Sequence, residues 1–357
     1  MIEEIIEITK SNIKRIRDKL ITEINVEYPE NEILYKSLLT KEYRNKIIDK
    51  IKKSYNFLEK NNYSDVDAFK KATNKLLDQS NTDLSEIIVK IENVINFIRE
   101  ITTESENEKQ SRIYEFLNIK NELYEIEKHS NSQVIVVNGD GGTGKTHLLT
   151  NMANELLSKN ITVIIFYGYS ISSFKYYIEE KIKVRNLFEE IDKISKSNNE
   201  KGVIIFDAIN EVNDDQENVI KYLIESVKNK NIKLIISYRN GDLEENALKV
   251  VKEYPHITLY GFADEIEAAV KFSEYYKIEI NEILESNYAN NPLILKIFCE
   301  QYGKKGSQKG QRGYNVATFI FEEYFETISK KIINELNITL NNGDIITGNI
   351  FWNNIAK

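Results

Sequence analysis

The sequence predicts an α/β fold in which a parallel sheet carries helices on both faces, with an all-α region before it and a small helical region after it. Three features of the 357 residues support this prediction. Up to about residue 130 the chain has no glycine and a single proline, Pro29, and its apolar residues recur at helical spacing. Beyond that point, short apolar runs alternate with helical patterns. A glycine-rich stretch follows the first of these runs.

Residues 1–111 are expected to form a helical N-terminal domain. Isoleucines and leucines return every three or four positions through most of this region. The polar segment Thr102–Ser111 predicts a linker or an exposed turn, followed by a helix over 112–128. No catalytic set or metal-ligand cluster stands out in the sequence here, and pairs such as Glu86 with Lys90 indicate a solvated helix face. We therefore interpret this domain as an effector, adaptor or oligomerisation module.

A parallel sheet is expected after residue 130, because parallel strands need crossover helices between them. Each expected strand is a short run rich in valine and isoleucine, which is typical of strands that are buried on both faces. The carboxyl ends of such strands share one edge of the sheet, where ligands bind. The expected strands are Gln133–Asn138, Ile161–Gly168, Gly202–Glu211, Ile232–Asn240 and Ile257–Phe262, and the helices between them include Thr146–Ser158, Phe174–Ile194 and Asp214–Lys228.

The glycine-rich stretch Gly139–Thr146, GDGGTGKT, fits the phosphate-binding loop G-x-x-x-x-G-K-[ST] between a strand and a helix. Glycines let backbone N–H groups point at a phosphate, and the following helix N-terminus attracts negative charge. Lys145 is expected to reach the β- and γ-phosphates, and Thr146 to ligate Mg²⁺, so the expected cofactor is ATP or ADP with Mg²⁺. The expected nucleotide-binding residues are Gly139, Gly141, Gly142, Thr143, Gly144, Lys145, Thr146 and the adjoining His147, for which packing beside the helix is the alternative.

Two later strand ends carry the other expected catalytic residues. Asp207 follows the apolar run VIIF, as expected for an aspartate that holds Mg²⁺. Glu211 is the candidate for polarising the attacking water, with a helix-start or surface acid as the alternative. Arg239 ends IISYR, where an arginine can contact a γ-phosphate; a surface arginine paired with Asp242 or Glu244 is the alternative. The expected catalytic set is Lys145, Asp207, Glu211 and Arg239, and the expected metal ligands are Thr146 and Asp207.

These motifs, with two later ones, resemble the STAND ATPases, and most closely the bacterial antiviral, Avs-like members of the NACHT branch. GDGGTGKT, DAINE, IISYR, LYGF and NNPLILKIFCE occur in the order seen in that family. The family has a small residue after the Mg²⁺ aspartate, here Ala208, and an acidic pair three residues on. In this sequence the pair is Asn210-Glu211, so an amide replaces the first acid. The resemblance covers residues 112–335 and implies that Pro292 lies near the nucleotide base.

The resemblance also implies a domain division and a function. It divides the chain into a P-loop NTPase core at 112–262, a helical lid at 263–335, and the start of a winged-helix-like domain at 336–357, which is truncated if the chain is a fragment. It implies a slow, regulatory ATPase in bacterial anti-phage defence. ADP holds a closed state, and ATP drives homo-oligomerisation that clusters the N-terminal domain. The trigger, such as a phage protein, would be sensed by a region or chain not present here.

Composition and charge argue against some classes of function and of cellular location. A net charge of −8 and a pI near 5.3 argue against a broad nucleic-acid footprint. The single cysteine, the acidic start and the lack of a membrane-length apolar run predict a reducing, cytoplasmic location.

The alternative function is a DNA-associated AAA+ or origin-recognition-like ATPase or loader. That class generally carries a lid arginine at the position where Leu293 follows Pro292 here. The basic segment Gly303–Gly313 is interpreted as a loop, with a nucleic-acid or partner contact as its alternative.

Overall fold

The computed structural model describes residues 2–17, 29–78, 84–101, 105–168, 186–285 and 290–305. One compact unit comprises Met1–Leu20, Tyr28–Gly141 and Lys145–Leu259, and a second comprises Ile21–Glu27, Gly142–Gly144 and Tyr260–Lys357. The sheet belongs to the first unit. The predicted segment 336–357, residues 306–335 of the predicted lid, and most of the basic segment Gly303–Gly313 lie outside the described residues.

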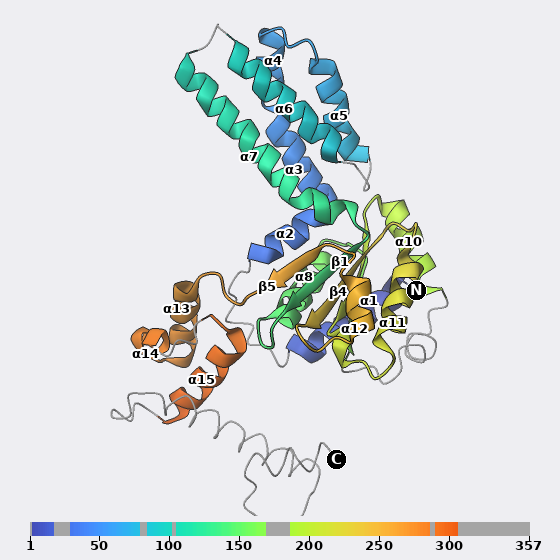
Figure 1. Cartoon of the computed structure of the whole chain (residues 1–357), viewed down its shortest axis with the longest axis vertical. Helices are drawn as coiled ribbons and strands as arrows, with labels where there is room; N and C mark the ends of the chain where they lie inside the picture. Colours follow the sequence, from blue (N-terminus) through green and yellow to red (C-terminus); the bar gives the residue numbers. More distant parts are fainter. Residues whose placement is uncertain are drawn as a thin grey trace, which may run out of the picture. The chain divides into compact units, whose positions relative to one another are not determined.

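A five-stranded parallel sheet forms the centre of the first unit (Figure 1). The strand order is β2-β3-β4-β1-β5, so β4 separates the strand that leads into GDGGTGKT from the strand that ends at Asp207. All five predicted strands are present, although the third ends at Asp207 because Ala208 turns into the left-handed region with a φ of 57°. The strands are β1 (Val134–Gly139), β2 (Val163–Tyr167), β3 (Gly202–Asp207), β4 (Ile232–Arg239) and β5 (His256–Leu259).

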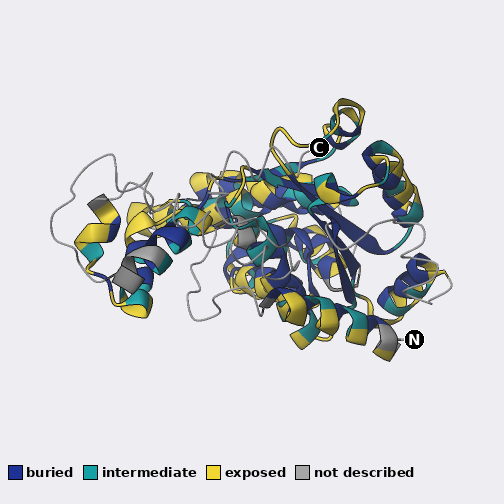
Figure 2. Ribbon diagram, turned by 90° about the horizontal axis from the view of Figure 1, so that it is seen from below, coloured by how far each residue is buried: buried dark blue, intermediate teal, exposed yellow. Residues whose placement is uncertain are grey.

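Helices cover both faces of this sheet, which confirms the predicted fold class. Apart from His256 and Thr258 in β5 and single positions in β1 and β4, the strand residues are buried (Figure 2). One face packs against apolar side chains of α10, α11 and α12, and α8 packs against β1, β2 and β3. Within the described residues the predicted helix Phe174–Ile194 appears only as the start of α10, and residues 174–185 lie outside them. The bounds are α8 (Lys145–Ser158), α10 (Leu187–Asn198), α11 (Gln216–Val227) and α12 (Glu245–Val251).

Helix α1 (Ile2–Arg17) runs along the edge strand β2. The Thr9 hydroxyl donates to the Val163 carbonyl at 2.9 Å, and the Asn12 amide donates to the Ile165 carbonyl at 2.7 Å. The free polar groups of an edge strand invite pairing with other chains, so these side chains protect the edge. The first helix of the predicted N-terminal domain therefore packs on the sheet, and the boundary at residue 111 stays a prediction.

Helices α3 to α7 form a helical bundle with its own apolar core (Figure 1). The core is built from isoleucine, leucine and phenylalanine side chains that face one another across the bundle. α2 contacts α7, α8 and β5. The all-α prediction for this region is therefore confirmed. The bounds are α2 (Pro29–Ser37), α3 (Lys41–Lys52), α4 (Tyr55–Lys60), α5 (Val66–Asp78), α6 (Leu84–Glu100) and α7 (Glu106–Asn131).

The predicted linker Thr102–Ser111 is wrong over its second half, because α7 begins at Glu106. Ser105 and Glu108 form a capping box, in which the Ser105 hydroxyl accepts from the Glu108 N–H at 3.4 Å. The Glu108 carboxylate in turn accepts from the Ser105 N–H at 3.1 Å. These two bonds satisfy N–H groups that a helix start leaves free, so a polar segment becomes the first turn of a helix.

The other end of α7 is fixed to the sheet by Lys233, a fully buried residue of β4. Its ammonium group donates to the carbonyls of His129 at 2.9 Å and Ser130 at 3.0 Å, and also to that of Ser132. Burial lowers the pKa of Lys233 well below its usual value. The last carbonyls of a helix lack intrahelical partners and attract a cation, so this side chain anchors the end of α7 to the sheet.

The second unit contains the predicted small helical region. Its helices share a core that includes Phe272, Leu295 and Cys299. Gly261 has a φ of +118° and its Cα approaches the Asn290 carbonyl so closely that a side chain would clash, which explains the glycine of the LYGF motif. No helix in the described part of the chain is long and apolar enough to cross a membrane. The bounds are α13 (Glu265–Tyr276), α14 (Ile280–Glu285) and α15 (Pro292–Lys305).

Candidate functional site

The phosphate-binding loop connects β1 to α8, as the motif requires. Gly142 and Gly144 have φ values of 80° and 97°, which favour glycine. Lys145 is the first residue of α8, and its ammonium group donates to the carbonyls of Gly139 at 2.7 Å and Asp140 at 2.8 Å. Burial lowers the pKa of Lys145, and the nearby carboxylate of Asp207 opposes this effect. The lysine thus lies over the loop, where a bound phosphate would meet it.

Asp207 lies at the end of β3 and is 1% exposed. Its Oδ1 accepts a hydrogen bond from the Ser237 hydroxyl, whereas its buried Oδ2 accepts none from the described residues. Burial raises the pKa of Asp207, and the Ser237 and Thr146 hydroxyls oppose this effect. A buried carboxylate oxygen without a partner is costly, so this atom fits a cation ligand.

The donor set fits a magnesium ion that is held mainly by phosphate and water. Asp207 supplies a carboxylate, and the Thr146 hydroxyl lies beside it. Among the described residues there is no cluster of three or more His, Cys, Asp or Glu side chains that could hold a metal. Mg²⁺ is typically bound by one or two protein oxygens together with substrate phosphates and water, which agrees with this sparse set.

Arg239 stands at the end of β4 with two carboxylates around it. Its guanidinium lies 3.8 Å from the Glu211 carboxylate and 3.3 Å from that of Asp242. A Cβ atom at Gly141 would lie 3.4 Å from Arg239 Nε, so the side chain also lies against the loop. Burial raises the pKa of Glu211, and Arg239 opposes this effect. The structure thus brings Arg239 beside the loop and also pairs it with Asp242, the partner expected for a surface arginine.

Two residues of this site were missed by the sequence reasoning. The Ser237 hydroxyl, fully buried, accepts from the Ala208 N–H at 2.9 Å while it donates to Asp207. The side-chain oxygen of Asn210 accepts from the Arg239 N–H at 3.1 Å. Ser237 has a signal in the sequence, because it is the one serine in the apolar run IISYR and sits opposite the end of the neighbouring strand. Asn210 was noted only as an amide in place of an acid.

A second group of polar side chains supports the loop at the carboxyl edge of the sheet. The Asn138 amide donates to Asn240 at 2.9 Å, and the Asn240 amide donates to the Asp140 carboxylate at 3.0 Å. The Thr258 hydroxyl donates to Asn138 at 2.9 Å. These bonds join β5, β1 and β4 to the first residues of the loop, so the loop is held by three neighbouring strands.

The remaining expected residues lie near the ends of the same motif or in the second unit. His147 is half-buried in the first turn of α8, and burial lowers its pKa. Thr143 is buried within the loop. Pro292 begins α15, and the N–H of the next residue, Leu293, donates to the Gly142 carbonyl at 3.3 Å within the second unit. Nucleotide contacts of His147, Thr143 and Pro292 stay predictions.

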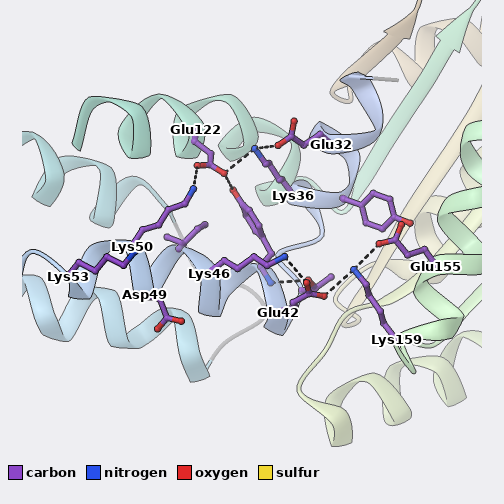
Figure 3. A pocket seen from close by; sticks show the side chains of 14 residues that line it. Glu32, Lys36, Glu42, Lys46, Asp49, Lys50, Lys53, Glu122, Glu155 and Lys159 are labelled. Carbon is purple, nitrogen blue, oxygen red and sulfur yellow. Dashed lines mark hydrogen bonds and ion pairs between the residues drawn. The ribbon is translucent and has the colours of Figure 1, made fainter. Parts of the chain in front are cut away.

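A separate pocket of about 520 Å³ lies where α2, α3 and α7 meet the far end of α8 (Figure 3). It contains none of the expected site residues, and its five lysines are matched by five carboxylates, so it does not favour an anion. We call the ion pairs around Glu122, Glu42 and Lys159 the α8 network. The Glu122 carboxylate binds Lys36 and Lys50, each at 3.0 Å, and Lys159 binds Glu42 at 3.1 Å.

Comparison with known proteins finds a family model that matches the residues of the loop and the site. Residues 135–251 match the model described as "ATPase family associated with various cellular activities (AAA)". Uncharacterized protein L666 of Acanthamoeba polyphaga mimivirus is 29% identical over 126 residues, which cover 31% of this chain and 50% of the relative. The chain thus spans about half the length of this curated relative.

Several solved structures are similar in fold at low sequence identity. AMPPCP-bound DnaA from Aquifex aeolicus has a TM-score of 0.37 at 14% identity, with 58% of this chain and 65% of that chain covered. PCH-2 of C. elegans has a TM-score of 0.32 at 14% identity, covering 55% and 62%. The RuvB Holliday junction branch migration motor of Thermotoga maritima has a TM-score of 0.30 at 16% identity, covering 57% and 69%. These likenesses concern the fold alone.

The family match agrees with the chemistry of the site. The parallel sheet, the phosphate-binding loop and the buried aspartate all lie within the matched residues or beside them. Residues 135–251 thus lie in a P-loop NTPase domain that is similar to the AAA family, and such a domain binds ATP or ADP with Mg²⁺ and hydrolyses ATP.

Proposed function

We propose that this ATPase is a signalling switch of the STAND/NACHT type, which acts in the cytoplasm in bacterial anti-phage defence. Nucleotide exchange controls homo-oligomerisation, and oligomerisation clusters the helical domain at 1–111. The core at 112–262 binds the nucleotide, the lid at 263–335 follows it in the chain, and a trigger such as a phage protein is sensed by another region or chain. The observation that carries this proposal is the set of partners around Arg239.

Arg239 has two competing kinds of partner. It contacts the Glu211 and Asp242 carboxylates while its side chain lies against Gly141 of the loop. A γ-phosphate is a stronger partner for a guanidinium than an exposed carboxylate, so ATP would draw Arg239 away from Glu211. ADP offers no γ-phosphate and leaves the carboxylate pairs in place. Such a residue makes the local arrangement depend on the nucleotide, which is what a switch requires.

Helix α8 gives the nucleotide site a physical route to the helical bundle. It begins at Lys145 and ends at Ser158, and the adjoining Lys159 binds Glu42 of α3 and lies 5.7 Å from the centre of the Tyr35 ring of α2. A movement of the loop that displaces α8 therefore changes contacts with two helices of the N-terminal region. This route supports an output through the helical domain rather than through nucleic acid.

The first test identifies the resting nucleotide and the assembly state. The purified protein is denatured, and the released nucleotide is identified by chromatography, with Lys145→Ala as the empty-site control. Light scattering then compares the protein with ADP and with ATPγS. The proposal expects bound ADP at rest and a larger particle with ATPγS only. An empty site that turns ATP over rapidly, without a trigger and without assembly, would overturn it.

A second candidate is a DNA-associated AAA+ ATPase or loader. The observation that favours it is the match of residues 135–251 to the AAA family. The net charge of −8 counts against it, because proteins that bind nucleic acid broadly carry a basic surface. Binding of duplex and single-stranded DNA is measured at two salt concentrations. Tight, salt-dependent binding by this chain alone would support the loader and contradict the switch.

A further inference from the structure

The chain after β3 is attached to the end of β4 by side chains rather than by the sheet ladder. Strand β3 ends at Asp207, and Ala208 turns away in the left-handed region. The Arg239 N–H on β4 therefore has no strand partner on that side, since the ladder between β3 and β4 stops at Phe206 and Ile236. The Asn210 side-chain oxygen accepts this N–H at 3.1 Å and replaces the missing partner.

We propose that Asn210 is a positioning residue for nucleotide discrimination, which fixes the main chain at Arg239 so that the guanidinium reaches a γ-phosphate. The inference rests on the nucleotide site of the proposed function but not on oligomerisation. An exposed arginine has many rotamers, and each hydrogen bond that it forms costs conformational entropy. Fixing its backbone removes one source of that freedom and keeps the side chain over Gly141.

Asn210 is itself held from the opposite side. Its carbonyl accepts from the buried Gln216 side chain at 3.1 Å, and the Gln216 oxygen accepts from the Glu244 N–H at 3.0 Å. The short helical turn Ile209–Glu211 thus lies between β4 and the start of α11. Because Glu211 is the next residue in the chain, the same turn sets the distance between the arginine and the carboxylate that is expected to polarise water.

The Arg239 N–H needs a hydrogen-bond acceptor at position 210. Asparagine and aspartate have nearly the same shape and differ in charge. Asn210 and an aspartate can both accept from the Arg239 N–H, so Asn210→Asp keeps the bond. Asn210→Ala removes the acceptor, and Asn210→Leu removes it at similar volume. Gln216→Ala is the matched control, because it loosens the same turn without removing the bond to Arg239.

The test measures dissociation constants for fluorescent ADP and fluorescent ATPγS, both with Mg²⁺, on the full chain. We expect Asn210→Ala to weaken ATPγS binding roughly two- to tenfold, the range for one lost hydrogen bond. The dissociation constant for ADP should stay unchanged. Asn210→Asp should keep the preference of the unchanged protein for ATPγS over ADP. In an Arg239→Ala background, Asn210→Ala should have no further effect. Gln216→Ala should lower the melting temperature and leave the ATPγS-to-ADP ratio unchanged.

The same measurements can overturn the inference. Equal losses for ADP and ATPγS would show that Asn210 acts on the fold of the loop and not through Arg239. A loss that persists in the Arg239→Ala background would lead to the same conclusion. If Asn210→Ala does not fold, Asn210→Leu decides in its place. Failure of the protein to assemble with ATPγS, with the discrimination by Asn210 intact, would instead contradict only the proposed switch.

Discussion

Ser237 is the residue through which β4 holds Asp207, the proposed Mg²⁺ ligand. It donates to Asp207 Oδ1 and leaves Oδ2 for a cation. We expect Ser237→Ala to raise the Mg²⁺ concentration for half-maximal ATP hydrolysis about tenfold, because a buried carboxylate oxygen loses a partner at a cost of about 1–3 kcal/mol. A magnesium titration of the ATPase rate measures this change.

Ser237→Thr is the control for this prediction, since it keeps the hydroxyl in the same place. The melting temperature of each variant separates a loss of folding from a loss of metal affinity. If Ser237→Ala has the magnesium dependence of the unchanged protein, the serine supports only the Ala208 turn, whose N–H it also accepts.

We expect Glu211 to make the ATPase rate depend on pH. Burial raises its pKa, and it must be ionised to polarise water, so activity should fall as the pH drops through a value above the ordinary 4.5. Arg239 lowers the pKa of Glu211 and Asp242 raises it. We therefore expect Arg239→Ala to move the acid limb of kcat to higher pH and Asp242→Asn to move it to lower pH.

Profiles of kcat against pH for both variants test the assignment of Glu211. Opposite displacements are expected only if Glu211 carries the titration. If the acid limbs of the two variants move in the same direction, or if neither moves, another group is responsible for the acid limb. The position of the limb is informative even where Arg239→Ala lowers the maximal rate.

The sequence indicated candidate residues for the chemistry but not how they are held. The loop, Asp207 and Arg239 follow from motifs whose order along the chain fixes their place at one edge of a parallel sheet. Asn210 holds Arg239 through a backbone N–H, and no residue pattern reports such a bond. Its role arises from the point at which β3 leaves the ladder, which depends on the left-handed turn at Ala208.

At the scale of elements, the α8 network ties the helical bundle to the helix of the phosphate loop (Figure 3). Glu122 accepts from Lys36, Lys50 and the Tyr43 hydroxyl. Burial raises the pKa of Glu122, but the two lysines outweigh this effect and lower it overall. Its stabilising contribution is therefore present above the unfolded value near 4.5 and is lost as the pH falls through the lower folded value.

We expect Glu122→Gln to lower the free energy of unfolding at pH 7 by about 1–3 kcal/mol, because charge-assisted bonds on a half-buried carboxylate are lost. Below pH 4.5 the difference from the unchanged protein should shrink. Denaturant unfolding between pH 3 and 7 measures both. Glu106→Gln is the control, because that exposed carboxylate has a 3.9 Å contact with Lys109 and an exposed hydrogen bond from the Gln110 amide, and its loss should change stability little. Equal effects of the two substitutions would contradict the role given to Glu122.

The type of each element, helix or strand, was easier to predict than the residues at which it begins and ends. The strands follow from valine and isoleucine runs, and the bundle helices follow from regular apolar spacing. The start of α7 was misplaced because the charged residues after Ser105 have no apolar pattern, and only the Ser105 to Glu108 spacing signals the cap. The packing of α1 on β2 depends on Thr9 and Asn12, whose partners are distant in sequence, so local patterns could not indicate it.

At the scale of the whole molecule, a signalling switch and a DNA loader should respond differently when bound ATP is not hydrolysed. Glu211→Gln removes the carboxylate that is expected to polarise water but leaves Lys145, Asp207 and Arg239, the residues expected to bind the nucleotide. We expect hydrolysis to fall about 10²–10⁴-fold, the usual contribution of a general base. ATP should then hold the protein in its ATP form, and a switch should assemble with ATP as it does with ATPγS. The substitution also removes one of the two carboxylates that compete with the γ-phosphate for Arg239, which favours the same form.

Sedimentation velocity of Glu211→Gln with ATP and with ADP, beside Lys145→Ala, decides between the two. Assembly with ATP alone, absent in Lys145→Ala, is the outcome for a switch. A monomer in every nucleotide state that gains DNA affinity when ATP is trapped is the outcome for a loader. Because the α8 network joins the loop helix to α3, Glu42→Lys in the same background should weaken assembly without changing ATP affinity, since the nucleotide residues are untouched. Loss of ATP binding in that variant would instead place the network within the nucleotide site rather than between the site and its output.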